Sequence, residues 1–204
     1  NPSFAQKLQV SVEAVGLQLR LPASDLATWA NLSILTANMT SPHKSIYGIE
    51  NGTDPFFVVV PQFLPCLMAQ KTPVSGEPNT ITVSLKPNVN LASSDQSRIT
   101  ISNLVSAIIP TTVSLNNVSG VDQGPEIFGG SGTFQGESLI LTVAAGQTLR
   151  AEVQYAFSFS LTNPSFDQAY PFVKIQANGT ALYLKRDVTV LDETVLGVTN
   201  GSNP

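Results

Sequence analysis

The amino-acid sequence predicts an all-β protein, an immunoglobulin-like antiparallel β-sandwich with extra strands. Short segments in which apolar and polar residues alternate recur along its 204 residues, and turns rich in Gly and Pro separate them. No window keeps the period of about 3.6 residues that marks a helix. The Cys…Trp…Cys pattern of antibody domains is absent, because Cys66 is the single cysteine. A chain of this length can bury a full core, as one large or two small domains.

The N-terminal part is expected to begin with two strands. Apolar and polar residues alternate over Leu8–Val12 and Leu17–Leu21, and Gly16 between them marks a turn or a β-bulge. Asp25–Ala30 is the best candidate for a single helical turn with a capping residue at its start. The apolar run Phe56–Val60 stops at a proline, which predicts a short buried strand.

The main core strands are expected later in the chain. Thr80–Leu85 and Arg98–Ser102 alternate cleanly, so that aliphatic side chains share one face and hydroxyl groups the other. Ser138–Val143, Leu149–Leu161 and Val173–Ala177 predict three more strands. One face of the longest run is expected to carry Val153, Tyr155, Phe157, Phe159 and Leu161.

These elements divide the chain into four expected segments. Residues 1–21 are interpreted as a linking or donor strand, and residues 22–62 as an accessory β segment or strands of the first sheet. Residues 63–186 are expected to form the main β-sandwich. Residues 187–204 are expected to begin the next repeat or to add a C-terminal strand.

The first forty-two residues return, imperfectly, as the last forty-two. The hexapeptide Asn1–Gln6 matches Asn163–Gln168, one extra residue follows near Tyr170, and Asp25 again matches Asp187. Between these points Val10, Val12, Ala14, Gly16, Leu19 and Leu21 align with Val173, Ile175, Ala177, Gly179, Leu182 and Leu184. A period of about 162 residues indicates tandem repetition or linkage of subunits. Pseudo-symmetry within one sandwich and chance resemblance are the alternatives.

The composition argues against two classes of partner. The formal net charge is −4 and no basic stripe exists, so nucleic acid is not an expected partner. Apolar residues make up 42% of the chain and charged residues 12%. No apolar run approaches the roughly 20 residues of a membrane helix, so no membrane span is expected.

Six Asn-x-Ser/Thr sequons predict an extracellular, N-glycosylated protein. They begin at Asn31, Asn38, Asn51, Asn117, Asn178 and Asn200. Covalent N-glycans are expected, and no cofactor is. Cys66 stands between apolar neighbours and is expected to be a buried small hydrophobe.

Several strand-like blocks resemble a known class of protein. They are Asn79–Leu85, Ile99–Leu104, Ser138–Val143 and Phe157–Pro164, followed by Val173. Such blocks resemble the repeated β-sandwich modules of large secreted, glycosylated surface and fibril proteins of unicellular algae and other protists. The resemblance spans roughly residues 60 to 180 and implies an extracellular, glycosylated and repetitive architecture, and it does not imply a catalytic site.

The residues needed for catalysis are scarce, so the chain is not expected to be an enzyme. His43 is the single histidine, and no Gly-x-Ser-x-Gly elbow accompanies it. Gly129–Gly132 lacks the Lys-Ser/Thr ending of a phosphate-binding loop and predicts a hairpin. With one His and one Cys in the chain, a zinc site is not expected. A glycosidase with paired carboxylates is a rival that the sequence leaves open.

Two other kinds of binding site are weaker candidates. Oxygen-rich clusters occur around Asp122 and Glu126 and around Glu50 and Asp54 with Asn51, but neither has the spacing of a known calcium loop, and no metal is assigned. Trp29 and Tyr47 are candidates for stacking on sugars. A monomeric carbohydrate-binding or adhesion module is therefore the alternative function.

The favoured hypothesis is a structural subunit or tandem module of an extracellular filament or surface fibre, with copies of itself as partners. An open sheet edge can accept a strand from the next unit, held by backbone hydrogen bonds and side-chain pockets. Segment 1–21 alternates, carries little charge and matches the segment that begins at Asn163. The apolar residues expected to join units are Leu8, Val10, Val12, Leu17, Leu19 and Leu21.

Overall fold

The structure, a computed structural model, describes residues 11–20, 29–40, 43–104, 110–121, 124–179, 183–187 and 189–190. Its strands are β1 (Ser11–Arg20), β2 (Trp29–Asn38), β3 (Phe63–Gln70), β4 (Pro78–Pro87), β5 (Leu91–Ala92), β6 (Arg98–Ser102), β7 (Thr112–Ser114), β8 (Asn116–Asn117), β9 (Ser131–Gln135), β10 (Ser138–Thr142), β11 (Thr148–Leu149), β12 (Tyr155–Thr162), β13 (Lys174–Asn178), β14 (Tyr183–Asp187) and β15 (Thr189–Val190). Two 3₁₀ turns, η1 (Ser93–Asp95) and η2 (Glu126–Phe128), interrupt them, and the described residues contain no α-helix. The predicted all-β class is confirmed.

The chain divides into two compact units. Residues 1–46 and 50–60 form the first, called here the ribbon unit, and residues 47–49 and 61–204 form the second, the sandwich unit. Each unit is described by itself below.

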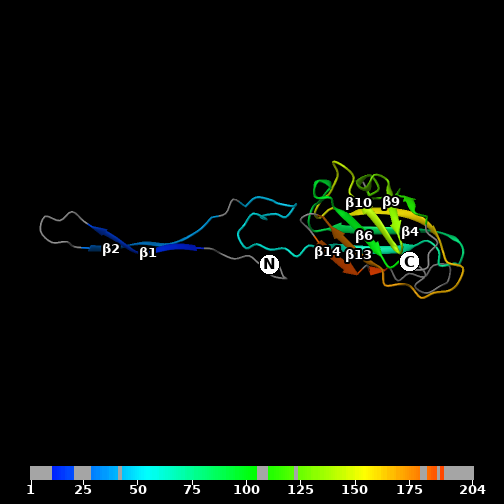
Figure 1. The fold of residues 1–204 in the computed structure, drawn as a ribbon, viewed down its shortest axis with the longest axis horizontal. Coiled ribbons are helices and arrows are strands. Elements are labelled where there is room, and N and C mark those ends of the chain that lie inside the picture. Colours follow the sequence, from blue (N-terminus) through cyan, green and yellow to red (C-terminus); the bar gives the residue numbers. More distant parts are fainter. Residues whose placement is uncertain are drawn as a thin grey trace. The chain divides into compact units, whose positions relative to one another are not determined.

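In the ribbon unit, β1 and β2 pair as an antiparallel two-stranded sheet (Figure 1). The pairing shifts between Val12 and Ala14 and again between Ala14 and Leu17, and the second shift contains Gly16. Gly16 therefore belongs to a β-bulge within one continuous strand and does not form a turn. The prediction of a helical turn at Asp25–Ala30 is wrong for its last two residues, because Trp29 and Ala30 begin β2. The remainder of that turn lies outside the described residues.

The sandwich unit consists of a six-stranded and a five-stranded sheet. The six-stranded sheet has the order β14-β13-β6-β10-β9-β7, and its pairs are antiparallel. The five-stranded sheet has the order β15-β3-β4-β12-β8, and its one parallel pair joins β15 to β3. A small pair, β5 with β11, accompanies them. This is the antiparallel sandwich with extra strands that the sequence predicts.

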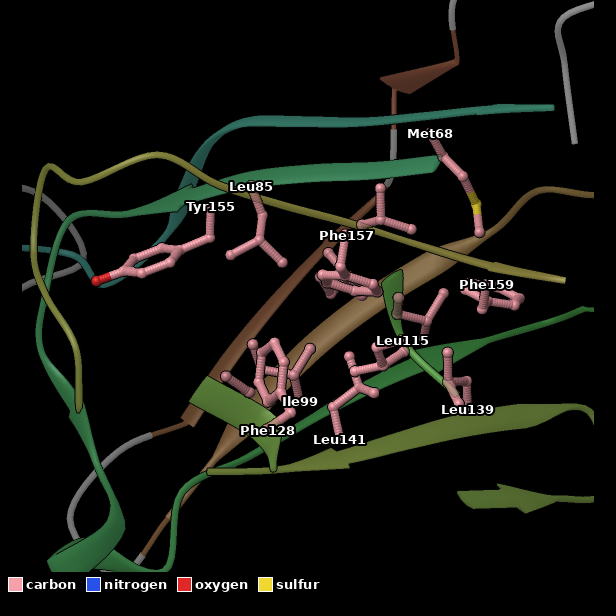
Figure 2. Close-up of a cluster of buried hydrophobic side chains, with 14 of the residues drawn as sticks. Met68, Leu85, Ile99, Leu115, Phe128, Leu139, Leu141, Tyr155, Phe157 and Phe159 are labelled. Carbon is pink, nitrogen blue, oxygen red and sulfur yellow. The ribbon is translucent and has the colours of Figure 1, made fainter. Parts of the chain in front are cut away.

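Alternating side chains of both sheets build one apolar layer. Figure 2 shows Phe157 and Phe159 of β12 directed toward Ile99, Leu139 and Leu141 of the other sheet, and all five are fully buried. The rings of Phe134 and Phe159, one from each sheet, meet edge to face with their centroids 6.1 Å apart. Cys66 is buried in β3, as its apolar neighbours predict.

Two apolar segments differ from the predictions. Phe56–Val60 forms no strand, and the side chain of Phe56 is 60% exposed. Val153 lies outside β12 and is 41% exposed, whereas the alternation from Tyr155 onward is buried as expected. The strand β3 was not predicted, because Pro65 cannot donate a ladder hydrogen bond. Pro65 lies where the pairing of β3 with β4 shifts, between Phe63 and Cys66.

A buried pair of asparagines ties the end of β12 to the loop between β3 and β4. Asn79 Nδ2 donates to Gln70 Oε1 and to Asn163 Oδ1, both at 2.8 Å, and Asn79 Oδ1 accepts from two backbone N–H groups of that loop. Asn163 Nδ2 donates to the carbonyl oxygens of Thr72 and Val74 at 3.0 and 2.8 Å. Because both side chains are at least nine-tenths buried, these groups depend on one another for partners.

Asn163→Ala is expected to lower the free energy of unfolding by roughly 2–3 kcal/mol, because one N–H of Asn79 Nδ2 loses its acceptor and the carbonyl groups of Thr72 and Val74 lose the donor Asn163 Nδ2. Urea denaturation followed by far-UV circular dichroism measures the change. Asn116→Ala is the matched control, because the Asn116 side chain is exposed, and its effect should stay within about 0.5 kcal/mol. Equal effects of the two substitutions would contradict the role assigned to the buried pair.

Candidate functional site

The two copies of the repeat take different structures. In the first copy, residues 11–20 form one continuous strand that pairs with β2. In the second copy, β13 and β14 pair with each other, with Asn178 opposite Tyr183, so the chain reverses between them. The two copies therefore lie in different sheets, and the repeat is not a pseudo-symmetry of one sandwich.

The second copy completes both sheets of the sandwich unit. On one side β13 pairs with β6 along its full length, from Lys174 opposite Ser102 to Asn178 opposite Arg98. On its other side β13 pairs with β14, the edge strand of the six-stranded sheet. Farther along, β15 pairs with β3 at the edge of the five-stranded sheet. We call the position of β13 and β14 beside β6 the closing position.

In the closing position, Val173 and Ile175, which match the predicted linking residues Val10 and Val12, are buried, and so is Ala177, which matches Ala14. Val173, Ile175 and Ala177 are 3%, 0% and 0% exposed. Their partners across the sheet include Ile101 opposite Ile175 and Ile99 opposite Ala177. These buried faces are the reason that an alternating, apolar segment is needed here.

Of the predicted linking residues themselves, Val12, Leu17 and Leu19 lie in β1, opposite Ala37, Leu32 and Ala30 of β2. Leu8, Val10 and Leu21 lie outside the described residues. The structure thus places three of the six within a pairing inside their own unit.

An exposed aromatic surface precedes β13. Phe166, Tyr170 and Phe172 are 57%, 50% and 77% exposed, and the last two rings meet edge to face with centroids 6.1 Å apart. Asn103 Nδ2 donates to the carbonyl oxygen of Phe172 at 3.0 Å, which holds this segment near the end of β6. Clustered exposed aromatic side chains are typical of surfaces that meet another molecule.

Two of the predicted glycosylation sites are exposed, and a third is half-buried. Asn117 in β8 and Asn178 at the end of β13 have exposed side chains, and Asn51 is half-buried in a turn. Asn31 and Asn38 lie in β2. Asn200 lies outside the described residues. Accessible amide groups are what attachment of an N-glycan requires.

The catalytic and metal candidates are not brought together. His43 Nδ1 lies 2.8 Å from Asp54 Oδ2, and the Asp54 side chain is buried. Within the described ranges, no group of three or more His, Cys, Asp and Glu side chains is placed to hold a metal ion. Glu126 Oε1 accepts a hydrogen bond from Asn117 Nδ2 at 3.4 Å. Asp122, the other carboxylate of that candidate cluster, lies outside the described residues. No helix in the described part of the chain has the length and apolar character to cross a bilayer.

One polar cavity of about 670 Å³ opens in the sandwich unit, and sequence reasoning did not find it. Its lining includes Asn90, Gln147, Arg150 and Tyr155, and among the described lining residues no carboxylate balances the guanidinium. The buried Tyr155 hydroxyl oxygen accepts a hydrogen bond from the Arg150 backbone N–H at 2.8 Å. A guanidinium with hydroxyl and amide donors suits a ligand rich in oxygen acceptors.

No protein-family profile matches the sequence, and no curated protein is significantly similar to it. Among solved structures, the chain is similar to BcpA, the major pilin subunit of Bacillus cereus, with 11% identity, a TM-score of 0.40, and coverage of 81% of this chain and 50% of that one. It is similar to BslA, a bacterial hydrophobin, with 14% identity, a TM-score of 0.31, and coverage of 64% and 99%. TM-scores this low carry no argument about function.

A third similarity corrects one prediction. An inactive variant of the GH20 exo-β-N-acetylglucosaminidase of Vibrio harveyi matches with 14% identity and a TM-score of 0.35, over 64% of this chain and 18% of the hydrolase. The matched structures therefore include a glycosidase. The expectation that the chain is not an enzyme is not upheld. The chain spans less than a fifth of that hydrolase, and the match does not show an enzyme either.

Proposed function

We propose that the chain is a structural unit of an extracellular, N-glycosylated filament or surface fibre, in which residues 1–21 of one unit complete the β-sandwich of its neighbour. One observation carries this proposal. The second copy of the same sequence, beginning at Asn163, supplies β13, β14 and β15 and thereby completes both sheets here. The resemblance of residues 60 to 180 to modules of protist surface proteins agrees with it.

The argument depends on an offset between the repeat and the fold. The sandwich ends after the point at which the second copy begins, so a unit of about 162 residues lacks its own closing strands. A sheet without those strands would leave the N–H and C=O groups along one side of β6 unpaired. A following copy, whose head is built like residues 163–187, would supply them by strand addition.

The external location rests on the sequons. If the protein is secreted through a glycosylating pathway, glycans are expected at the exposed Asn117 and Asn178. Asn117→Gln and Asn178→Gln should each lower the mass of the secreted protein by one N-glycan, as measured by intact-mass spectrometry before and after enzymatic deglycosylation. Asn116→Gln, one residue from a sequon, is the control and should change no glycan mass. Unmodified Asn117 and Asn178 in secreted protein would count against this part of the proposal.

Deletion of residues 1–15 tests the linkage. The sandwich should remain folded, because its described strands lie in residues 63–190, but copies should no longer associate. Sedimentation velocity over a range of concentrations and electron microscopy of the assemblies measure association. Glu13→Gln is the matched control, because the second copy has Gln176 at the same place, and it should associate like the original chain. Filaments that persist without residues 1–15 would refute the proposal.

Binding of an acidic carbohydrate is the second candidate function, and the polar cavity is the observation that favours it. Arg150 can hold a carboxylate through two parallel hydrogen bonds, and the exposed Val153 beside it offers an apolar contact for a sugar ring.

Arg150→Ala is expected to weaken binding of uronic-acid oligosaccharides by about tenfold, because a charge-assisted hydrogen bond is lost. Isothermal titration calorimetry measures the affinity, and Lys174→Ala removes an exposed cation outside the cavity as the control. If the original chain binds no acidic oligosaccharide, or if both substitutions weaken binding equally, the cavity is not this site.

A further inference from the structure

We propose that residues 10–25 of one unit enter the closing position of a neighbour by folding back after Gly16 into a hairpin, in place of the straight strand β1. This inference rests on the proposed function and specifies its position, register and conformational change. Three features of the closing position are each matched in the first copy.

The first feature is a close approach of two backbones. A Cβ atom added to Gly179 would lie 2.8 Å from the backbone oxygen of Asp95 and 3.1 Å from Ser97 Oγ. A carbon atom is not tolerated that near a backbone oxygen without displacement, so this position accepts glycine alone. The matching residue of the first copy is Gly16.

The second feature is the size of the buried side chains. Ala177 is fully buried opposite Ile99, and Val173 and Ile175 are buried on the same face of the strand. The first copy has Ala14 at the position of Ala177. It also has β-branched valines, Val10 and Val12, at the other two positions, so its apolar face is close in volume to that of β13.

The third feature is the asparagine that begins the segment. Asn163 is held by Asn79 and by carbonyl groups of the loop between β3 and β4, and its N–H donates to the carbonyl oxygen of Glu77. The first copy begins with Asn1 in the same hexapeptide. The second copy has one extra residue near Tyr170, in a stretch outside the strands where most side chains are exposed, so the shorter first copy can make the same connection.

The structure also contains the alternative conformation that such a change needs. In the first copy, residues 11–20 form the continuous strand β1, and its pairing shifts at Gly16. In the second copy, the matching residue Gly179 comes just after the end of β13. Glycine is the residue best able to take either backbone conformation. The sheet that β1 must leave has two strands, and two-stranded sheets contribute little stability of their own. In this chain β13 and β14 already fill the closing position, so a neighbour's segment enters when that position is vacant.

The test uses full-length acceptor and donor chains. The acceptor carries Gly179→Val, which places a side chain against Asp95 and expels its own β13, together with Thr100→Cys. The donor carries Glu13→Cys, because residue 13 matches Gln176, which lies opposite Thr100 in β6. Under mild oxidation we expect a disulfide-linked heterodimer on a non-reducing gel.

Two donors are matched controls. The donor with Ser11→Cys is two residues out of register with Thr100 and should give at least about tenfold less linked dimer. The donor with Gly16→Val and Glu13→Cys should also fail, because its valine would meet the same backbone that excludes a side chain at position 179. A second acceptor, with Ala177→Glu in place of Gly179→Val, empties the position by burying a carboxylate and guards against misfolding of one variant.

The outcomes separate this inference from the proposed function. Selective cross-linking of Glu13→Cys with both acceptors, lost on Gly16→Val, supports the closing position and its hairpin. Equal cross-linking by all three donors, or none by any, overturns the inference. If association still requires residues 1–15 in that case, the proposed function stands and the linking strand binds elsewhere.

Discussion

The sandwich depends on the pairing of β13 with β6. Ile99 and Ile101 of β6 are fully buried, and β13 is the strand that covers that side of them, with Ile175 opposite Ile101. Without it, backbone groups of β6 would lack partners and the apolar layer between the sheets would meet water. The segment that prevents this is the beginning of the second copy. The residues that complete the sheet are therefore residues of the sequence repeat.

Local patterning was sufficient to predict the central strands. Thr80–Leu85, Arg98–Ser102 and Ser138–Val143 alternate with a period of two because each has one face on the core and one toward water, and each forms a strand close to its predicted bounds. The same rule failed for Val153 and for Phe56–Val60, which are apolar but form no strand. Apolar character indicates that a residue can be buried, whereas burial itself depends on a partner distant in sequence.

The candidate site was predictable in part for the same reason. Repetition identified residues 1–21 and their matches after Asn163, because two similar hexapeptides are visible without a structure. The pairing of β1 with β2, and of β13 with β6, depends on contacts between distant segments that periodicity does not contain. The reason for glycine at 179 likewise becomes evident with the position of Asp95. The cavity beside Arg150 is assembled from several loops, and no motif marks it.

The offset between repeat and fold determines what kind of junction the proposed fibre would have. Units whose folds ended at the repeat boundary would be joined by linkers, and relative motion of domains would be the default. Here Asn163, the first residue of the second copy, already has its side chain buried within the sandwich. A junction made by an equivalent head segment would consist of the same hydrogen bonds and apolar contacts as the inside of one unit. The stability of the junction would then follow the stability of the fold. Such a junction would depend little on ion pairs and therefore little on salt, which agrees with a chain in which charged residues make up 12%.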